Sequence, residues 1–487
     1  MSFSFSCNRD WRISSSESWI RLSPSSGTGS DEAIKVTITC DANTTYDERK
    51  CTFSIVAEEL NETISVTQTQ NKGIVLTSDK TLTVESGAGE YAIEYKTNDL
   101  ISVMINDDAK EWVKVIFGPS TKSLHDEYVI IKVYPNDLYE WRSTLIELVT
   151  AESKSEMIRL NQKGKDPIDL SSAETANCYI VPLTNDKYCF NASVRGNSEE
   201  AIRDGSKASI IWQYESMDSG TQTIVKNVSY DKEKGVISFY PSGRPGNALV
   251  ALRDDAGSIL WSWHLWCFDY DEENGFHTIN GYKLMDRNLG AIDRIEAGFA
   301  YQWGRKDPFP FFYTDSEIDR TTCSSSEIGS IDYAAAHPTT VIFNGYASYG
   351  PNGGWHWISK ENYSVLWGSG KTSNDPCPPG WKVISNGYMV MRNIPTGVFS
   401  KDEEGLVYFE EPYCVPKMLL PYQTLFSENG STRSELPGGL TTWTARTYAD
   451  GELGEVLCVR DGFWFYPYDA SGNAASRGQN VRCQRIN

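Results

Sequence analysis

The chain has 487 residues, which suggests about three or four domains. Its 45 basic and 65 acidic residues give a formal net charge of −20, which argues against a surface for nucleic acid or anionic membrane. Hydrophobic residues make up 40% of the chain, enough for several cores, so global disorder is excluded. The 26 Tyr and 15 Trp beside 8 Met favour β-sandwich cores and aromatic binding surfaces over a helical bundle.

The N-terminal residues, MSFSFSC, lack the basic region and the apolar stretch of a signal peptide. They show the alternation of a strand that begins abruptly, so we expect a truncated chain whose export signal lies upstream of Met1. No run of about 18 apolar residues predicts a segment that spans a membrane.

Two segments in the first third of the chain share one residue spacing. A Trp is followed by an Asn after 24 residues, by an Arg after 30, and by a Gln after 49 or 50. The matched residues are Trp19, Asn43, Arg49 and Gln68 in the first copy and Trp112, Asn136, Arg142 and Gln162 in the second. Alternating runs such as VTITC and LIELV predict half-buried strands in both copies. Each copy is therefore predicted to be a β-sandwich with the Trp in its core or at its edge, the Asn in a turn, and the Arg along a strand.

These residues resemble the Bacteroidetes-associated carbohydrate-binding often-N-terminal (BACON) family, which has a similar Trp, Asn and Arg and a closing V-T-Q strand. The resemblance covers residues 2–71 and 72–165, and the first copy lacks the family's opening strand. It implies two immunoglobulin-like sandwiches, residues 1–71 and 72–165, that act as a stalk. A sugar site is not carried over to them.

The segment KGKDPID, residues 163–169, contains Gly and Pro and predicts a linker. Short β-like runs and Gly-containing hairpin loops follow, so residues 166–275 are predicted to form a third β-sandwich. Its densest aromatic run, LWSWHLWC, is predicted to be a central strand between two apolar environments. Cys267 follows His264 by three residues, which places the two on opposite faces of that strand and argues against a Cys–His nucleophile pair.

Four sequence blocks mark the last part of the chain: GYKLMDRNLGA (281–291), YQWGRKDPFP (301–310), DPCPPGWKV (375–383) and NVRCQRIN (480–487). As a set they resemble the Fibrobacter succinogenes major paralogous domain, over residues 276–487. The resemblance implies a mixed α/β, C-type-lectin-like fold with long loops. Together with the module before it, this domain is similar to surface lipoproteins of the fimbrillin and fimbrial-tip type.

The chain has 11 cysteines, so at least one thiol is unpaired in a monomer. Two pairs flank predicted turns and could form local bridges or remain buried thiols: Cys40 with Cys51, and Cys178 with Cys189. Cys377 and Cys483 lie in two blocks of the paralogous domain, and the resemblance implies a disulfide between them. Two neighbouring buried thiols are the alternative.

Seven residues of the blocks are predicted to be structural, either as a buried polar network that fixes loops or as core tryptophans: Asp286, Arg287, Asn288, Trp303, Arg305, Asp307 and Trp381. The ligand surface is instead assigned to aromatic clusters outside the blocks, because exposed Trp and Tyr stack on sugar faces. These ligand-binding candidates are Trp355, His356, Trp357, Trp443, Trp464 and Tyr466. Core packing is the alternative for each cluster.

No catalytic residue, metal or cofactor is predicted. The sequence has no G-x-S-x-G, H-E-x-x-H or P-loop motif and no His pair at metal-ligand spacing. The acidic turn at residues 269–275 could hold calcium but lacks the full EF-hand pattern, and the motifs of calcium-dependent lectins are absent. Carboxylates far apart in the chain leave a glycosidase open, but the small predicted domains argue against one.

The combined prediction is a non-catalytic, mainly β, multidomain adhesion protein, whose tandem immunoglobulin-like sandwiches present a lectin-like head to a glycan or to a host or microbial surface protein. We expect it outside the cell, as an outer-membrane lipoprotein or in a fimbria, without a nucleic-acid partner. Two alternatives remain open. One is a fimbrial tip or assembly subunit with protein–protein contacts, and the other is an accessory glycan-capture protein of a polysaccharide-use system.

Overall fold

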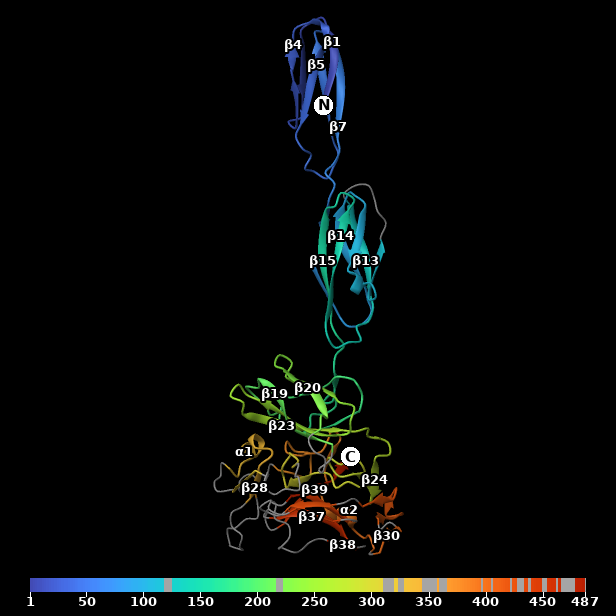
Figure 1. Ribbon diagram of the computed structural model, residues 1–487, viewed down its shortest axis with the longest axis vertical. Helices are drawn as coiled ribbons and strands as arrows, with labels where there is room; N and C mark the ends of the chain where they lie inside the picture. The colour runs from blue at the N-terminus through green and yellow to red at the C-terminus, as the bar shows by residue number, and fades with distance from the viewer. Residues whose placement is uncertain are drawn as a thin grey trace. The chain divides into compact units, whose positions relative to one another are not determined.

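A computed structural model gives the fold of the chain, which divides into two compact units, Met1–Asp166 and Pro167–Asn487 (Figure 1). The structure describes the whole chain except residues 118–124, 216–221, 310–318, 323–327, 344–356, 359–365, 396, 404–405, 421–422, 427–432, 437–438, 449–452, 461–462, 466–477 and 487. The described part is mainly β, as predicted. It contains no helix with the length and apolar character needed to cross a membrane.

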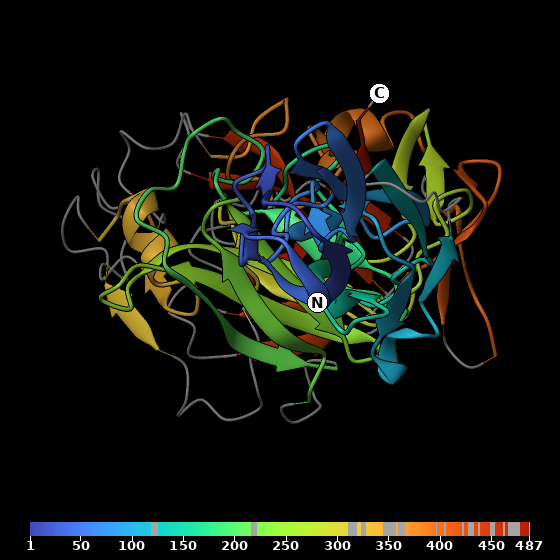
Figure 2. The ribbon, with the colours of Figure 1, turned by 90° about the horizontal axis from the view of Figure 1, so that it is seen from above.

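The first unit begins with a sandwich of two sheets, which is drawn in dark blue (Figure 2). Their strand orders are β1-β5-β3 and β4-β2-β6-β7. The strands are β1 (Ser2–Cys7), β2 (Trp11–Ser15), β3 (Ile20–Ser23), β4 (Ser26–Gly27), β5 (Ser30–Cys40), β6 (Arg49–Ala57) and β7 (Leu60–Gln68). Alternate residues of β6 are buried, as expected for a strand with one face on a core.

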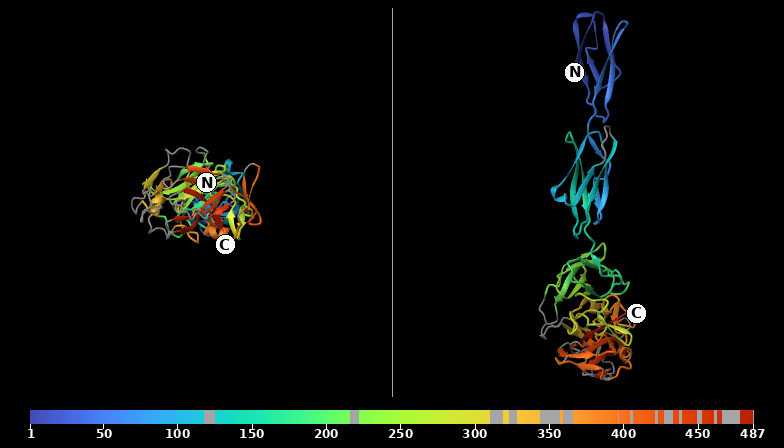
Figure 3. Two further views of the ribbon diagram at one scale, coloured as in Figure 1. Left: turned by 90° about the horizontal axis from the view of Figure 1, so that it is seen from below. Right: turned by 90° about the vertical axis from the view of Figure 1, so that its right-hand side faces the viewer.

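The second sandwich of this unit has sheets in the orders β12-β13-β10-β8 and β11-β14-β15-β9 (Figure 3, right). Its strands are β8 (Ile74–Leu76), β9 (Thr81–Val84), β10 (Gly89–Thr97), β11 (Ile101–Ile105), β12 (Val113–Phe117), β13 (His125–Val133), β14 (Arg142–Thr150) and β15 (Ser155–Gln162). Six strands correspond in order and pairing to strands of the first sandwich, β10–β15 matching β1, β2, β3, β5, β6 and β7. Two strands, β8 and β9, have no counterpart among the strands of the first sandwich.

The four repeated residues form the same arrangement in both sandwiches, which we call the Trp–Arg–Gln–Asn motif. The guanidinium of Arg49 lies 4.3 Å from the ring centre of Trp19, and that of Arg142 lies 4.4 Å from that of Trp112. Each Arg also donates through Nε to Oε1 of its Gln, at 2.8 Å and 2.9 Å. The Arg thus packs on the indole and pairs with the closing strand, a more specific role than the predicted packing along a strand.

The Asn of the motif fixes a turn, as predicted. In the second copy, Nδ2 of Asn136 donates to the carbonyls of Glu140 and Lys163, at 2.9 Å and 3.0 Å. Asn43 makes the same pair of bonds in the first copy, to the carbonyls of Asp47 and Thr69. In both copies the Asn side chain thus bridges a carbonyl of its own turn and a carbonyl just after the closing strand, which explains why the spacing recurs.

The two motif glutamines are expected to differ in their contribution to stability. Gln162 is fully buried and its Nε2 reaches the carbonyls of Ser86, Gly87 and Tyr134, whereas Nε2 of Gln68 reaches only that of Asp41. Gln162→Ala is expected to cost about 2–3 kcal/mol and Gln68→Ala about 1 kcal/mol, because unpaired buried carbonyls are costly. Hydrogen exchange of the strand that carries each Gln, measured by mass spectrometry, tests this. Equal losses in the two strands would contradict it.

The second unit begins with a further sandwich, with sheets in the orders β16-β18-β21-β20 and β17-β23-β22-β19. Its strands are β16 (Ile168–Asp169), β17 (Cys178–Val181), β18 (Tyr188–Asn191), β19 (Lys207–Tyr214), β20 (Val225–Asp231), β21 (Val236–Pro241), β22 (Gly246–Arg253) and β23 (Ile259–Cys267). Strand β23 is the predicted central aromatic strand. Trp263 and Cys267 face the core of this sandwich, while Trp266 faces the core formed with later residues, so the strand lies between two apolar environments as expected.

After residue 275 the described strands form further sheets, in the orders β29-β40-β25-β24-β32, β35-β34-β39-β36-β37-β38 with β26 on β39, β30-β31-β33, and β27-β28. The strands are β24 (Phe276–Ile279), β25 (Tyr282–Met285), β26 (Ala300–Gln302), β27 (Arg320–Thr322), β28 (Val341–Phe343), β29 (Trp381–Val383), β30 (Phe399–Lys401), β31 (Val407–Phe409), β32 (Cys414–Val415), β33 (Met418–Leu419), β34 (Gln423–Phe426), β35 (Arg433–Leu436), β36 (Gly439–Tyr448), β37 (Leu453–Arg460), β38 (Phe463–Phe465), β39 (Gly478–Val481) and β40 (Cys483–Arg485). The helices assigned in the described part are α1 (Ile331–Ala336) and α2 (Gly387–Met391).

One hydrophobic core spans the predicted boundary at residue 275. Trp212, Leu249 and Trp266 from the sandwich pack in the same cluster as Tyr301 and Trp381 from the later sheets. Asn247 of β22 adds a buried bond through Nδ2 to the carbonyl of Gly290, at 2.8 Å. Residues on both sides of the boundary therefore bury their apolar surface together, in agreement with their assignment to one compact unit.

Candidate functional site

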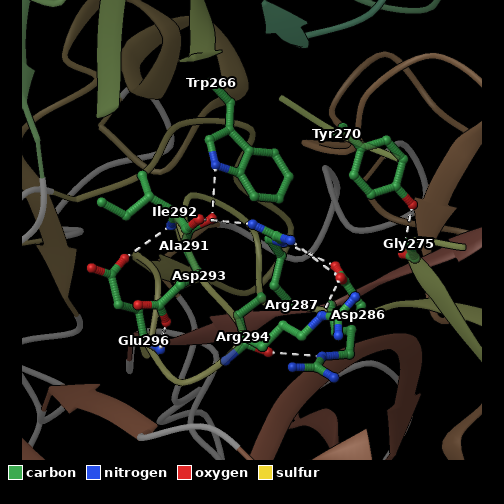
Figure 4. Close-up of polar contacts among 12 residues, drawn as sticks. Trp266, Tyr270, Gly275, Asp286, Arg287, Ala291, Ile292, Asp293, Arg294 and Glu296 are labelled. Carbon is green, nitrogen blue, oxygen red and sulfur yellow. Dashed lines mark hydrogen bonds and ion pairs between the residues drawn. The ribbon is translucent and has the colours of Figure 1, made fainter. Parts of the chain in front are cut away.

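The residue Asp286, from the first sequence block, directly follows strand β25 and is the centre of a buried ionic network (Figure 4). Its side chain is only 2% exposed and pairs with Arg287 at 2.9 Å and with Arg294 at 2.7 Å. Burial alone would raise the pKa of Asp286, but the hydrogen bonds and charges of the two arginines outweigh it and hold the pKa below its usual value. The carboxylate is therefore ionised and fully engaged by the protein.

Arg287, which pairs with Asp286, also holds the loop that follows it in the chain. Arg287 stacks over Phe268, at 4.6 Å, and donates to the carbonyl of Ile292, at 2.8 Å. Trp266 holds the same loop by donating through Nε1 to the carbonyl of Ala291. These contacts make Asp286 and Arg287 parts of a structural network, as their interpretation from sequence proposed.

Asn288 links the loop to the last strand of the chain. Its Nδ2 donates to the carbonyl of Ala297, and its Oδ1 accepts from Nε of the buried Arg482, at 2.9 Å. Burial lowers the pKa of Arg482 to about 10, which leaves the guanidinium charged at neutral pH. This buried hydrogen bond joins the first and last sequence blocks, together with the backbone bond from the amide of Leu289 to the carbonyl of Val481 at 2.8 Å.

The second block places three charged residues in the interior, each about 2–3% exposed. Arg305 donates to the carbonyls of Thr340 and His337, at 2.7 Å and 2.9 Å. Lys306 and Asp307 form an ion pair of 2.7 Å. The adjoining cavity is only about 10 Å³, the size of one water molecule, so this cluster has no room for a ligand.

The two block tryptophans predicted to be core residues are buried. Trp303 is 1% exposed and donates through Nε1 to the carbonyl of Thr444, at 2.8 Å. Trp381 opens strand β29 and packs edge-on against Tyr270. Neither indole is accessible to a ligand.

Of the six residues predicted to bind ligand, Trp357 alone has a described side chain. It is 1% exposed, and its Nε1 donates to the carbonyl of Trp303 at 2.6 Å, so its assignment as a stacking surface is corrected to core packing. Trp355, His356 and Tyr466 lie outside the described residues. Trp443 and Trp464 lie in strands β36 and β38, and their side chains lie outside the description.

The structure contains the disulfide implied for Cys377 and Cys483. The two possible local bridges are not formed, since none of their four members is in a disulfide: Cys40, Cys51, Cys178 and Cys189. Among the described residues, no group of three or more His, Cys, Asp or Glu side chains is arranged to hold a metal.

A buried His–Cys contact in the sandwich has no counterpart in the sequence-based predictions. Nδ1 of His264 lies 3.6 Å from Sγ of Cys178, while Nε2 lies 2.8 Å from Oδ1 of Asn247. Burial lowers the pKa of His264 to about 3 and raises that of the Cys178 thiol well above its usual value. Both side chains are therefore neutral, and the contact lacks the thiolate that a nucleophile needs.

His264 is expected to make the second unit sensitive to acid. Its pKa rises from about 3 in the folded chain to 6.5 on unfolding, so the unfolded chain binds more protons between these values and stability falls as the pH falls below 6.5. At pH 5 the loss is about 2 kcal/mol. Denaturant titrations at pH 7 and pH 5 should show a smaller pH effect for His264→Gln than for the unchanged chain. An equal pH effect in the His264 variant and the unchanged chain would contradict this.

The loop between β13 and β14 exposes an apolar patch that the sequence-based predictions missed. Trp141 is 61% exposed and Leu138 is 64% exposed, and we call these two side chains the Trp141 patch. The motif residue Asn136 holds the loop, because its Oδ1 accepts the amide of Leu138. One feature of the sequence could have indicated this exposed side chain. Trp141 directly precedes the motif residue Arg142, whereas the polar Glu48 directly precedes Arg49 in the first copy.

Comparisons with known proteins identify a family for part of the chain. Residues 9–69 match the BACON family model, described as "Putative binding domain, N-terminal", which confirms the resemblance for the first copy. A comparison with curated proteins finds no match.

Several solved structures match the chain at low similarity. Titin domains I67–I69 are 10% identical, with 55% of this chain and 92% of that chain covered and a TM-score of 0.25. PcdhgB3 EC1-4 is 13% identical, with 55% and 68% covered and a TM-score of 0.26. Domains 4 and 5 of the S-layer protein SbsC are 14% identical, with 33% and 74% covered and a TM-score of 0.18. Similarities this low support no functional inference, so the family match of residues 9–69 is the finding that bears on function.

Proposed function

We propose that the chain is a non-catalytic, extracellular adhesion protein that binds a glycan through its second sandwich. The observation that carries this proposal is the exposed Trp141 patch on a module that repeats the motif of the matched binding domain. In the described part of the chain, Trp141 is the only tryptophan among the exposed large hydrophobic residues. An indole that is 61% exposed offers the flat apolar face on which a sugar ring stacks.

The surroundings of the patch are suited to a sugar. Asp137 and Glu140 are exposed in the same loop, and carboxylates accept hydrogen bonds from sugar hydroxyls. The backbone of the loop is held in place by Asn136 and by the amide of Lys165, which donates to the carbonyl of Leu138 at 2.7 Å. Such preorganisation reduces the entropy lost on binding.

The location outside the cell is supported by the Cys377–Cys483 disulfide, because disulfides persist mainly in oxidising compartments. The proposal retains the C-type-lectin-like assignment of residues 276–487 and the lipoprotein or fimbrial attachment as its finer parts, which rest on sequence resemblance.

Glycan-array binding by the full chain, first with calcium and then with EDTA, tests the proposal. We expect binding that survives EDTA. Binding should fall at least about tenfold in Trp141→Ala, since the stacking of a ring on an aromatic side chain contributes on the order of 1–3 kcal/mol where it has been measured for nucleic-acid bases. Met157→Ala removes another exposed apolar side chain of the same sandwich and is the matched control.

The remaining outcomes decide between the alternatives. Binding that is unchanged in Trp141→Ala would overturn the assignment of the patch, and binding lost in EDTA would require a metal site. No binding to any glycan would favour protein–protein adhesion or fimbrial assembly. Preference for soluble polysaccharides over cell-surface glycans would favour glycan capture, and release of shortened products would overturn the non-catalytic proposal.

A further inference from the structure

We propose that a cleft between the two sheets of the second sandwich binds a small organic amine, with the ammonium group at an acidic rim and the apolar body on an aliphatic floor. The cleft is lined by residues of β9, β10 and β15 and by the segment 77–79, and we call it the β9–β10 cleft. Neither residue of the Trp141 patch lines it. The inference is therefore independent of the glycan proposal, because it concerns a different place and a different class of ligand.

The path of the chain from β8 to β9 creates the cleft. Strand β8 pairs with β10 only as far as Leu76, which lies opposite Tyr95. The chain then crosses to the other sheet, where β9 pairs with β15 from Thr81 onward. Strand β10 extends beyond the end of β8, and there Ala92 pairs with β13 and also lines the cleft. The cleft thus lies where the edges of the two sheets separate.

The floor of the β9–β10 cleft is aliphatic. Ile93 and Ile158 line it and are each only 1% exposed, and Leu82 is half-buried against the same core. The volume of the cleft is about 410 Å³. Small-molecule sites have volumes of roughly 300–1,000 Å³, so a compact apolar body can be accommodated and gains free energy by leaving water.

Backbone hydrogen bonds hold the rim of the cleft in place. The amides of Thr77 and Ser78 both donate to the carbonyl of Glu94, each at 3.0 Å. The amide of Glu94 donates in return to Oγ of Ser78, at 2.7 Å. At the other end of the crossing segment, the carbonyl of Lys80 accepts from the amide of Arg159, at 2.9 Å. The rim is therefore fixed before a ligand arrives, which lowers the entropy lost on binding.

The charge of the lining selects a cation. Among the described residues that line the cleft, the charged ones are Asp79 and Glu94, and both are exposed. Lys80 follows Asp79 in the chain but does not line the cleft, and its Nζ lies 3.6 Å from Oε2 of Glu156. Two carboxylates without a lining basic group attract an ammonium ion and repel an anion.

The remaining lining residues favour an organic cation over a metal ion or a sugar. Thr77 and Thr81 are exposed at the cleft, and their hydroxyl oxygens can accept hydrogen bonds from an ammonium group. The described lining has no His, Cys or third carboxylate that would complete a metal site. It also has no aromatic side chain on which a sugar ring could stack.

Three probes with a similar apolar body and different charge test the proposal: 2-phenylethylamine, 2-phenylethanol and 3-phenylpropanoate. Binding to the full chain is measured by saturation-transfer NMR titration. We expect the amine to bind saturably, the alcohol to bind about fivefold more weakly, and the carboxylate not to bind, because two exposed carboxylates contribute modestly. Raising the salt concentration from about 20 mM to about 500 mM should weaken binding of the amine and leave that of the alcohol unchanged.

A pair of double variants locates the site. Asp79→Asn with Glu94→Gln removes both rim charges and keeps the size of the side chains, so binding of the amine should fall about fivefold to the level of the alcohol. Asp108→Asn with Glu111→Gln is the matched control, because it removes the same charge from two exposed residues of this sandwich that do not line the cleft. The control should bind the amine as the unchanged chain does.

Four results would overturn the proposal. The first is the absence of saturable binding of the amine, and the second is equal binding of all three probes. The third is an equal loss in the two double variants, which would show attraction by net charge alone. The fourth is loss of amine binding in Trp141→Ala, because the ammonium would then lie on the exposed indole. Each of these is separate from the glycan-array result.

Discussion

Replacing Cys377 and Cys483 by alanine is expected to lower the free energy of unfolding of the Pro167–Asn487 unit by about 4–5 kcal/mol. The disulfide joins residues 106 apart, so it removes much of the freedom of a long loop in the unfolded chain. Both cysteines are fully buried beside the shared core, and Cys483 lies in β40, whose neighbour β29 follows Cys377 in the chain. The bridge therefore ties the segment before β29 to the strand that pairs with β29.

Guanidinium titration, followed by the fluorescence of the tryptophans buried in this unit, measures the effect. Cys189→Ala is the matched control, because Cys189 is a buried cysteine of the same unit that is not in a disulfide. We expect the control to lose about 1 kcal/mol, in keeping with the removal of one small side chain from a core. A loss as small as the control's in the double variant would mean that folding of the unit does not rely on the disulfide.

The two sandwiches of the first unit were predictable because the residues that repeat contact one another at a fixed spacing along the chain. A Trp that packs under an Arg, and an Arg that pairs with a Gln across two antiparallel strands, require a fixed spacing along the chain. The alternation of residues then gives the strand period. The roles of Trp19 and Asn43 could therefore be inferred from their distances in sequence, whereas the stacking of Arg49 on the indole and its bond to Gln68 required the structure.

The shared core of the second unit was not predictable in the same way. Four sequence blocks distinguish residues 276–487 from the preceding sandwich. Such blocks do not show which buried surfaces are in contact. Trp212 and Trp266 satisfy the strand pattern whether their outer faces meet solvent, another sheet or a ligand. The contact that decides between these lies far away in the chain, at residues such as Tyr301.

The candidate site shows the same division. A buried polar network that includes Asp286 was predicted, although its partners were not, since charged residues beside buried strands must be paired. Trp357 was assigned wrongly, because a Trp after a Gly-containing turn has the same local pattern whether exposed or buried. Trp141 was missed for the opposite reason. It stands alone in its loop, and the sequence-based search favoured clusters of aromatic residues.

Asp307→Ala is expected to cost about 3–5 kcal/mol of the stability of the second unit, because it leaves Lys306 buried without its counter-ion. Nζ of Lys306 donates to Oδ1 of Asp307 and lies 4.4 Å from the ring centre of Trp261, and the residue is only 3% exposed. Burial lowers the pKa of Lys306 to about 8 although Asp307 opposes that shift, so removal of the carboxylate should lower the pKa further.

The double variant Lys306→Met with Asp307→Leu separates the cost of an unpaired charge from the value of the pair. We expect it to lose far less stability than Asp307→Ala, because apolar replacements of similar volume remove both desolvated charges together. The pH gives a second test, since a lysine with a folded pKa below its unfolded value of 10.5 destabilises the fold least at high pH. The stability deficit of Asp307→Ala should therefore shrink as the pH rises from 7 to 10, while the deficit of the double variant should not. Equal deficits in the two variants at every pH would show that lost packing, rather than the unpaired ammonium, is the cause.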